Sequence, residues 1–273
     1  MFVDIQVPLF FGLIAALVTS IGLVAVAQKK VWSERHAGLF ALAAGGMLLT
    51  LIVLHIAPEA FELSSHAAVL IAVGFFAALI VRTLLNKFFG DKAAGSSSAI
   101  EAVAPILAIA IHSFLDGIIY AVTFAASFES GLFAALSLIL HEFPEGVIAF
   151  AILRRTGVSN RNAFFFAFLA AAATTPLGVL AAAPSVNTLG AEDIGNLFAV
   201  SAGLLLFVAT GPLLAPIRTQ PSTQGFAALA CGVIFAFGLN YLPLNGHRHA
   251  KNVNAADGGQ ASFEASVEGR ANV

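Results

Sequence analysis

The chain of 273 residues is 59% hydrophobic and only 10% charged, with a mean hydropathy of +0.93. This composition excludes an ordinary soluble domain and indicates an integral membrane protein. The formal net charge of -2 gives no sign of nucleic-acid binding, and the single cysteine, Cys231, excludes a disulfide framework or a cysteine-rich zinc site. Any metal ligands must therefore be histidines and carboxylates.

Windows of about 20 apolar residues, the length that crosses a bilayer, occur eight times along the chain. The expected spans are 7–27, 37–60, 66–86, 100–127, 131–153, 161–183, 195–216 and 223–243. The sequence therefore predicts an all-α integral membrane protein in which residues 1–243 form one domain of eight transmembrane helices. Residues 244–273 are rich in Gly, Asn, Ala and charged side chains, and we expect a disordered polar C-terminal tail there.

The basic residues between the expected spans are confined to alternate connections. They follow the first, third, fifth and seventh spans and are Lys29, Lys30, Arg35, Arg82, Lys87, Lys92, Arg154, Arg155, Arg161 and Arg218. The other connections carry Glu62, Glu129, Glu192 and Asp193 but no lysine or arginine. By the positive-inside rule the basic connections face the cytoplasm, so both termini are expected outside.

Two related motifs lie in the fourth and fifth expected spans. The first is His112-Ser113-Phe114-Leu115-Asp116-Gly117 and the second is His141-Glu142-Phe143-Pro144-Glu145-Gly146. In each motif a histidine and a carboxylate are four residues apart, which places both on one face of a helix. Ionisable side chains are costly at membrane depth and are usually there for function, so the matched pairs indicate an intramembrane metal or proton site.

The two motifs are expected to meet at one depth in the bilayer. Both are equally far from a turn near residue 128, and about 14 residues of helix span about 21 Å, which reaches the middle of the bilayer. The residues expected to converge on one cation are His112, Asp116, His141 and Glu145, with Glu142 adjacent and able to bridge to a second. Imidazole and carboxylate together favour Zn²⁺, Fe²⁺ or Mn²⁺ over Mg²⁺ or Ca²⁺. The alternative is that these side chains only hydrogen-bond to one another.

A third set of polar residues lies in the second expected span. Glu59, Glu62 and His66 follow His55 at offsets of 4, 7 and 11, which forms one helical stripe toward the external end. This stripe predicts an acidic funnel that gathers cations, with His55 deep enough to join the central site. Alternatively, Glu62 and His66 only mark the solvated end of the helix.

These motifs, with His55-x-x-Pro58-Glu59 and eight spans, resemble the ZIP family of divalent-metal transporters over nearly all of residues 1–243. The resemblance implies a transporter, not an enzyme, that moves Zn²⁺, or Fe²⁺ or Mn²⁺, into the cytoplasm through a pathway lined by spans 2, 4, 5 and 7. It also implies that the site is often binuclear, that homodimers are common and, for a prokaryotic source, that the protein lies in the plasma (inner) membrane. The expected metal residues are His55, Glu59, His112, Ser113, Asp116, His141, Glu142 and Glu145.

Two of the chain's departures from the family pattern concern the second metal position. Ser113 stands where many members have Asn, and Thr174 and Thr175 lie near the depth where some members supply a Glu. Neutral hydroxyl oxygens are weak ligands for such a cation compared with carboxylate or imidazole. We therefore expect one strong metal position and a weak second one.

Two other classes of protein remain open from the residues alone. An intramembrane zinc metalloprotease would use His-Glu-x-x-His on a helix, but here Glu145 stands at the last position and Pro144 lies within the motif. A proton-conducting or structural membrane protein without metal is the other alternative. Bound metal that is lost on changing His141 would favour the transporter, and cleavage of a membrane substrate would favour the protease.

Overall fold

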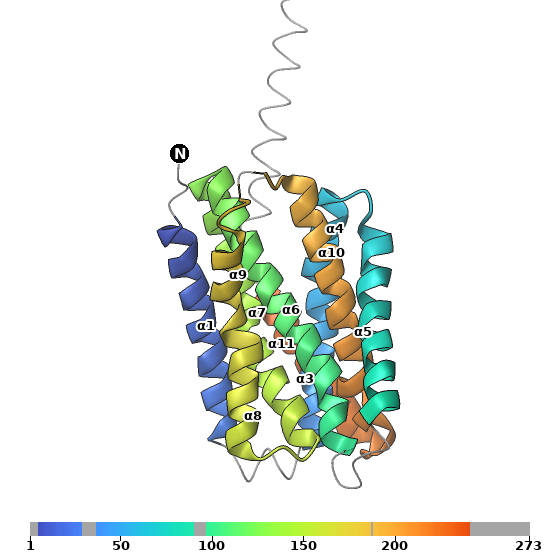
Figure 1. Ribbon diagram of the computed structural model, residues 1–273. Helices are drawn as coiled ribbons and strands as arrows, with labels where there is room; N and C mark the ends of the chain where they lie inside the picture. The colour runs from blue at the N-terminus through green and yellow to red at the C-terminus, as the bar shows by residue number, and fades with distance from the viewer. Residues whose placement is uncertain (1–4, 29–36, 90–96, 187, 241–273) are drawn as a thin grey trace, which may run out of the picture.

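The computed structural model describes residues 5–28, 37–89, 97–186 and 188–240. Every regular element in these ranges is a helix, and the helices lie side by side in one bundle (Figure 1). The all-α prediction is thereby confirmed for this part of the chain. The predicted polar tail, 244–273, and the basic connections at 29–36 and 90–96 lie outside the described residues.

The helices follow the order of the expected spans. They are α1 (Gln6–Ala27), α3 (Ala37–Leu51), η1 (Ile52–Ile56), α4 (Ala57–Leu63), α5 (Ala67–Phe89), α6 (Ser97–Ala126), α7 (Phe128–Arg155), α8 (Asn160–Ala167), η3 (Phe168–Ala172), α9 (Thr174–Ala182), α10 (Ala191–Val208), η4 (Ala209–Leu213), η5 (Ala215–Arg218) and α11 (Ser222–Asn240). Three of them, η1, η3 and η4, are π-helical, and η5 is a 3-10 turn. Within the described residues, each expected span overlaps one helix or one run of consecutive helices.

Within the described residues, six helical segments are long and apolar enough to cross a membrane. They are Gln6–Ala27, Gly38–Leu63, Ala67–Phe88, Glu101–Ala126, Asn160–Ala182 and Ala191–Arg218. A seventh is formed if the two halves of α7, Phe128–Leu136 and His141–Arg155, are counted as one span, and the apolar part of α11, Ser222–Gly238, is shorter. The chain is therefore a multi-pass membrane protein. The count of eight spans and the external termini stay predictions.

The departures from regular helix adjoin prolines, which lack a backbone N–H and clash with the carbonyl four residues earlier. Pro58 follows η1, Pro176 follows η3 and Pro212 lies within η4. Pro144 lies inside α7, and the helix bends by 44° between Leu136 and His141, next to the carbonyl that this proline displaces. The motif at residues 141–146 is therefore carried on a bent helix, as its proline indicates.

The helices pack in two sets. The first set is α1, α6, α7 and the run α8–α9, and the second is the run α3–α4, α5, α10 and α11. The two sets meet where α6 packs against α5 and α10, and where α3 packs against α7. Both motif helices thus belong to the first set and face the second across this boundary.

The glycine that ends each motif lies where two helices approach closely. A Cβ atom on Gly117 would lie 2.0 Å from the backbone oxygen of Thr175 on α9, and one on Gly146 would lie 2.3 Å from the backbone oxygen of Thr19 on α1. Small residues allow membrane helices to pack with their backbones in contact. The two glycines therefore bring α9 and α1 against the turns that carry Asp116 and Glu145.

Candidate metal site

The two motifs are positioned by a tight helical hairpin. Ser127 alone separates α6 from α7, and its hydroxyl accepts a hydrogen bond of 3.0 Å from the backbone N–H of Ser130 at the start of α7. The two helices pack along each other, so residues equally far from the turn lie at the same level. This hairpin brings the first motif opposite the second.

Three predicted ligands form a compact cluster. His141 Nε2 lies 2.9 Å from Asp116 Oδ2, and His112 Nε2 lies 3.6 Å from the same oxygen. One ligand atom from each of the three residues lies within 4.8 Å of the others, and all three side chains are buried. The arrangement places two imidazoles and one carboxylate around a single point, which suits a divalent transition metal.

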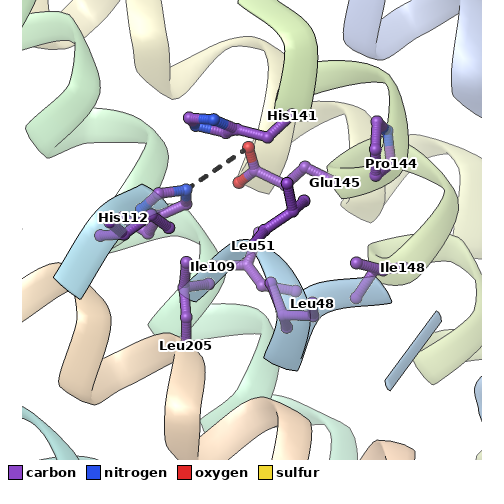
Figure 2. A pocket seen from close by; sticks show the side chains of 10 residues that line it. Leu48, Leu51, Ile109, His112, His141, Pro144, Glu145, Ile148 and Leu205 are labelled. Carbon is purple, nitrogen blue, oxygen red and sulfur yellow. Dashed lines mark ion pairs between the residues drawn. The ribbon is translucent and has the colours of Figure 1, made fainter. Parts of the chain in front are cut away.

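Glu145 lies at the edge of this cluster. Its Oε2 is 3.9 Å from His112 Nε2, the ion pair that Figure 2 marks with a dashed line. Its Oε1 accepts a hydrogen bond from Ser113, which also donates 3.0 Å to the carbonyl of Ile109. Ser113 therefore orients Glu145, and its single O–H is shared among Glu145 and the backbone carbonyls of Ile109 and Ala170.

Glu142 points to a different neighbour. Its carboxylate is buried and accepts a hydrogen bond from the hydroxyl of Thr19 on α1. Thr174, the predicted weak ligand of a second position, donates 2.7 Å to the carbonyl of Ala170, whereas its neighbour Thr175 is fully buried. The hydroxyls of Thr19 and Thr174 are thus already hydrogen-bonded within the protein, whereas that of Thr175 has no hydrogen-bond partner among the described residues.

Several buried polar atoms of the motifs have no hydrogen-bond partner within the described residues. They are Asp116 Oδ1, His141 Nδ1, Glu142 Oε1 and Glu145 Oε2. Buried polar groups are normally hydrogen-bonded, and buried charges are paired or coordinate a metal. Three buried carboxylates, each with an oxygen that accepts no hydrogen bond, form a donor set that a cation would complete.

The predicted stripe of the second span runs away from the cluster. The His55 ring lies in η1 with its centroid 6.4 Å from that of His141, which places it beside the cluster. Glu59 follows one turn later on α4 and is partly exposed. Farther out, His66 Nδ1 lies 3.5 Å from Glu192 Oε1 of α10, and both side chains are largely exposed. His55 is therefore near the site, and His66 lies at the surface.

Two contacts to the motif residues come from side chains that the sequence interpretation did not include. His112 Nδ1 shares a hydrogen bond with Ser201 on α10, and Thr19 holds Glu142 as described above. Both side chains are fully buried. Each is a hydroxyl in an otherwise apolar helix, and Ser20 follows Thr19 directly, so the sequence offers no signal that distinguishes either residue. Ser201 links the first motif to the second set of helices and fixes the orientation of the His112 ring.

We expect Ser201→Ala to weaken zinc binding about 10-fold to 100-fold, the usual cost of removing a group that orients a metal-binding histidine. The hydroxyl holds Nδ1 so that Nε2 faces Asp116. Calorimetric titration with zinc measures this change. Thr50→Ala is the matched control, because that hydroxyl bonds to Gly46 of its own helix, and it should bind zinc normally. Equal affinity in the two variants would contradict this role.

An apolar layer closes one side of the cluster. The side chains below His112, His141 and Glu145 in Figure 2 are Leu48, Leu51, Ile109, Ile148 and Leu205, which line a cavity of about 10 Å³. Such a volume holds about one water molecule at most. Ile109 precedes His112 on α6 and Ile148 follows Glu145 on α7, so the layer lies toward the end of the bundle that the sequence predicts to be cytoplasmic.

The fold and the cluster together define a multi-pass membrane protein with a buried imidazole–carboxylate centre. A family model described as ZIP zinc transporter matches residues 90–240, more than half of the chain. The chain belongs to the ZIP zinc transporter family, a family of transporters rather than enzymes. The resemblance inferred from the motifs is confirmed.

Individual relatives are similar over shorter segments. The chain is 34% identical over 105 residues to the human zinc transporter ZIP4, covering 38% of this chain and 16% of the relative. It is 29% identical over 132 residues to the metal cation symporter ZIP14 of Danio rerio, covering 47% and 25%. It is 28% identical over 147 residues to the zinc transporter ZIP13 of Pongo abelii, covering 50% and 44%. The chain thus spans less than half the length of these relatives.

Proposed function

We propose that this protein carries a divalent transition metal, Zn²⁺ before Fe²⁺ or Mn²⁺, through the membrane into the cytoplasm. The observation that carries the proposal is the buried cluster of His112, Asp116 and His141, whose ligand atoms lie within 4.8 Å of one another. Membership of the ZIP family and the names of the relatives support zinc as the substrate. The proposal includes eight spans with both termini outside, a plasma or inner membrane location, and association as a homodimer.

The proposed metal residues are those of the two motifs and the nearby stripe. Asp116 and the two imidazoles supply the primary ligands, and Glu145 lies close enough to complete them after a small side-chain movement. His55 and Glu59 mark the approach to the cluster from the end of α4. Entry of the metal from the end of α4 is consistent with the position of the apolar layer, because that layer lies between the cluster and the opposite end of the bundle.

We propose a single tight metal position. Ser113 and Glu142 are already hydrogen-bonded to Glu145 and Thr19, and Thr174 to a backbone carbonyl. Two cations a few ångströms apart also repel strongly where the dielectric constant is low. A second cation beside Glu142 would therefore have to displace these hydrogen bonds, and apart from that carboxylate it would find mainly weak hydroxyl ligands.

The metalloprotease alternative is not favoured. In that chemistry the glutamate after the first histidine activates a metal-bound water. Here the corresponding Glu142 accepts a hydrogen bond from Thr19, and a carboxylate replaces the second histidine of the motif. Membership of a transporter family points the same way.

The function is tested with the purified full chain in proteoliposomes. We expect uptake of ⁶⁵Zn that unlabelled Zn²⁺ suppresses more strongly than Fe²⁺ or Mn²⁺ at the same concentration. Calorimetric titration of the same protein should give one tight zinc per chain. Uptake no faster than in liposomes without protein would contradict transport, and two equally tight sites would contradict the single position.

A further inference from the structure

A second cavity, separate from the metal cluster, opens on the outer surface of the bundle. It has a volume of about 280 Å³ and is lined by Phe40, Ala43, Ala44, Met47, Phe143, Pro144, Val147, Cys231, Gly232 and Phe235. These residues come from α3, α7 and α11, and α3 packs against both other helices. We call this cavity the lateral groove. It follows the boundary between the two sets of helices.

The lateral groove has a buried floor and an exposed rim. Ala44, Met47 and Val147 are buried, whereas Cys231 and Phe235 on α11 are exposed, Phe235 to 49%. Every side chain of the lining is apolar or weakly polar, so water gains no hydrogen bond from these side chains. A groove of this kind within a membrane span opens onto lipid, whose acyl chains match its chemistry.

The charge at one end of the lateral groove favours an anionic lipid. Phe40 lies near the start of α3, where a Cβ atom on Gly38 would touch the side chain of Gln220. The turn η5, which ends at exposed Arg218, packs against the same helices, α3 and α11. From Phe40 to Met47 the groove extends about 10 Å along the helix. A lipid chain lying in it would bring its headgroup to the basic end of the bundle.

We propose that the lateral groove binds one acyl chain of an anionic phospholipid, with the headgroup at the Arg218 end. Attraction of anionic headgroups to basic residues at membrane boundaries supplies the preference for charge. The bound chain would contact Phe143 and Pro144, which lie between His141 and Glu145 in the second motif. The lipid site therefore borders the turn that carries the metal ligands. The proposal of a lipid site is argued from the apolar lining and the nearby charge, and it does not depend on metal transport.

Tryptophan fluorescence tests this site in the full chain. The single tryptophan, Trp32, is first replaced by phenylalanine, and Phe235→Trp then places the only indole at the rim of the groove. Phe237→Trp is the matched control, since residues two apart on a helix point about 200° from each other. Phe237 is 40% exposed and lies outside the groove lining. The proteins are reconstituted in phosphatidylcholine with increasing dibrominated phosphatidylglycerol, which quenches adjacent indoles.

The groove probe should reach half-maximal quenching at a several-fold lower fraction of brominated phosphatidylglycerol than the control probe. Cys231→Phe, which fills the groove from its rim, should remove this difference, whereas Ile234→Phe on the lipid-facing side should keep it. Coincident curves for the two probes would overturn the site. Absence of quenching at the groove probe would also overturn it. If brominated phosphatidylcholine gave the same difference between the two probes, the proposed preference for an anionic headgroup would be wrong.

Discussion

His141→Ala is expected to remove tight zinc binding and most zinc uptake while leaving the protein in the membrane. The imidazole is one of the three groups that form the compact cluster among the described residues, and its Nε2 lies 2.9 Å from Asp116. Loss of a group that merely orients a ligand costs about 10-fold to 100-fold in affinity, so loss of the ligand itself should cost at least about 100-fold. Calorimetry and isotope uptake on the same preparation measure both effects.

The control for this change is a histidine of the same chain that lies at the surface. His66→Ala removes an imidazole whose side chain is 70% exposed and pairs with Glu192 outside the cluster. Its zinc affinity and uptake should stay near those of the unmodified protein. Near-normal uptake in both His141→Ala and Glu145→Ala would show that the motifs do not hold the transported metal.

Gly117→Ala is expected to destabilise the protein, although alanine is the better helix former. Without contacts, this substitution would gain about 0.5–1 kcal/mol of stability in a helix. Here the added Cβ would lie 2.0 Å from the Thr175 oxygen and 2.8 Å from the Val179 nitrogen, both backbone atoms. Forcing α6 and α9 apart should cost about 1–3 kcal/mol or more and displace the adjacent Asp116. Thermal unfolding in detergent measures the loss.

Gly238→Ala is the matched control for Gly117→Ala. Gly238 also lies in a helix, α11, but a Cβ atom there would have no neighbour within 4 Å. This variant should unfold at the same or a slightly higher temperature, and its zinc affinity should not change. Equal unfolding temperatures for the two variants would mean that the close approach of α6 and α9 does not require glycine.

The sequence predicted the helices and the main cluster because both depend on short-range patterns. Runs of apolar residues determine where the spans lie, and the four-residue spacing of histidine and carboxylate determines a shared helix face. The position of Pro144 inside the second motif similarly indicates the bend of α7. These features need no knowledge of how distant helices pack.

The partners of the cluster could not be predicted, since they come from helices far away in the chain. Ser201 reaches His112 across 89 positions, and Thr19 reaches Glu142 across 123. Nothing in their local sequence distinguishes these hydroxyls from others, such as Thr50, that bond within their own helix. The orientation of Glu142 toward α1 follows from the close approach at Gly146, which only the packed structure reveals.

The single-residue connection between α6 and α7 also affects how the chain enters the bilayer during synthesis. Each of these helices, inserted alone, would expose a histidine and at least one carboxylate to lipid, and a charged side chain at the bilayer centre costs about 2.5–3.5 kcal/mol on insertion scales. Joined by Ser127 alone, they can leave the translocon as one hairpin in which His141 already faces Asp116. The residues proposed to hold the substrate would then also shield one another while the membrane protein is being made.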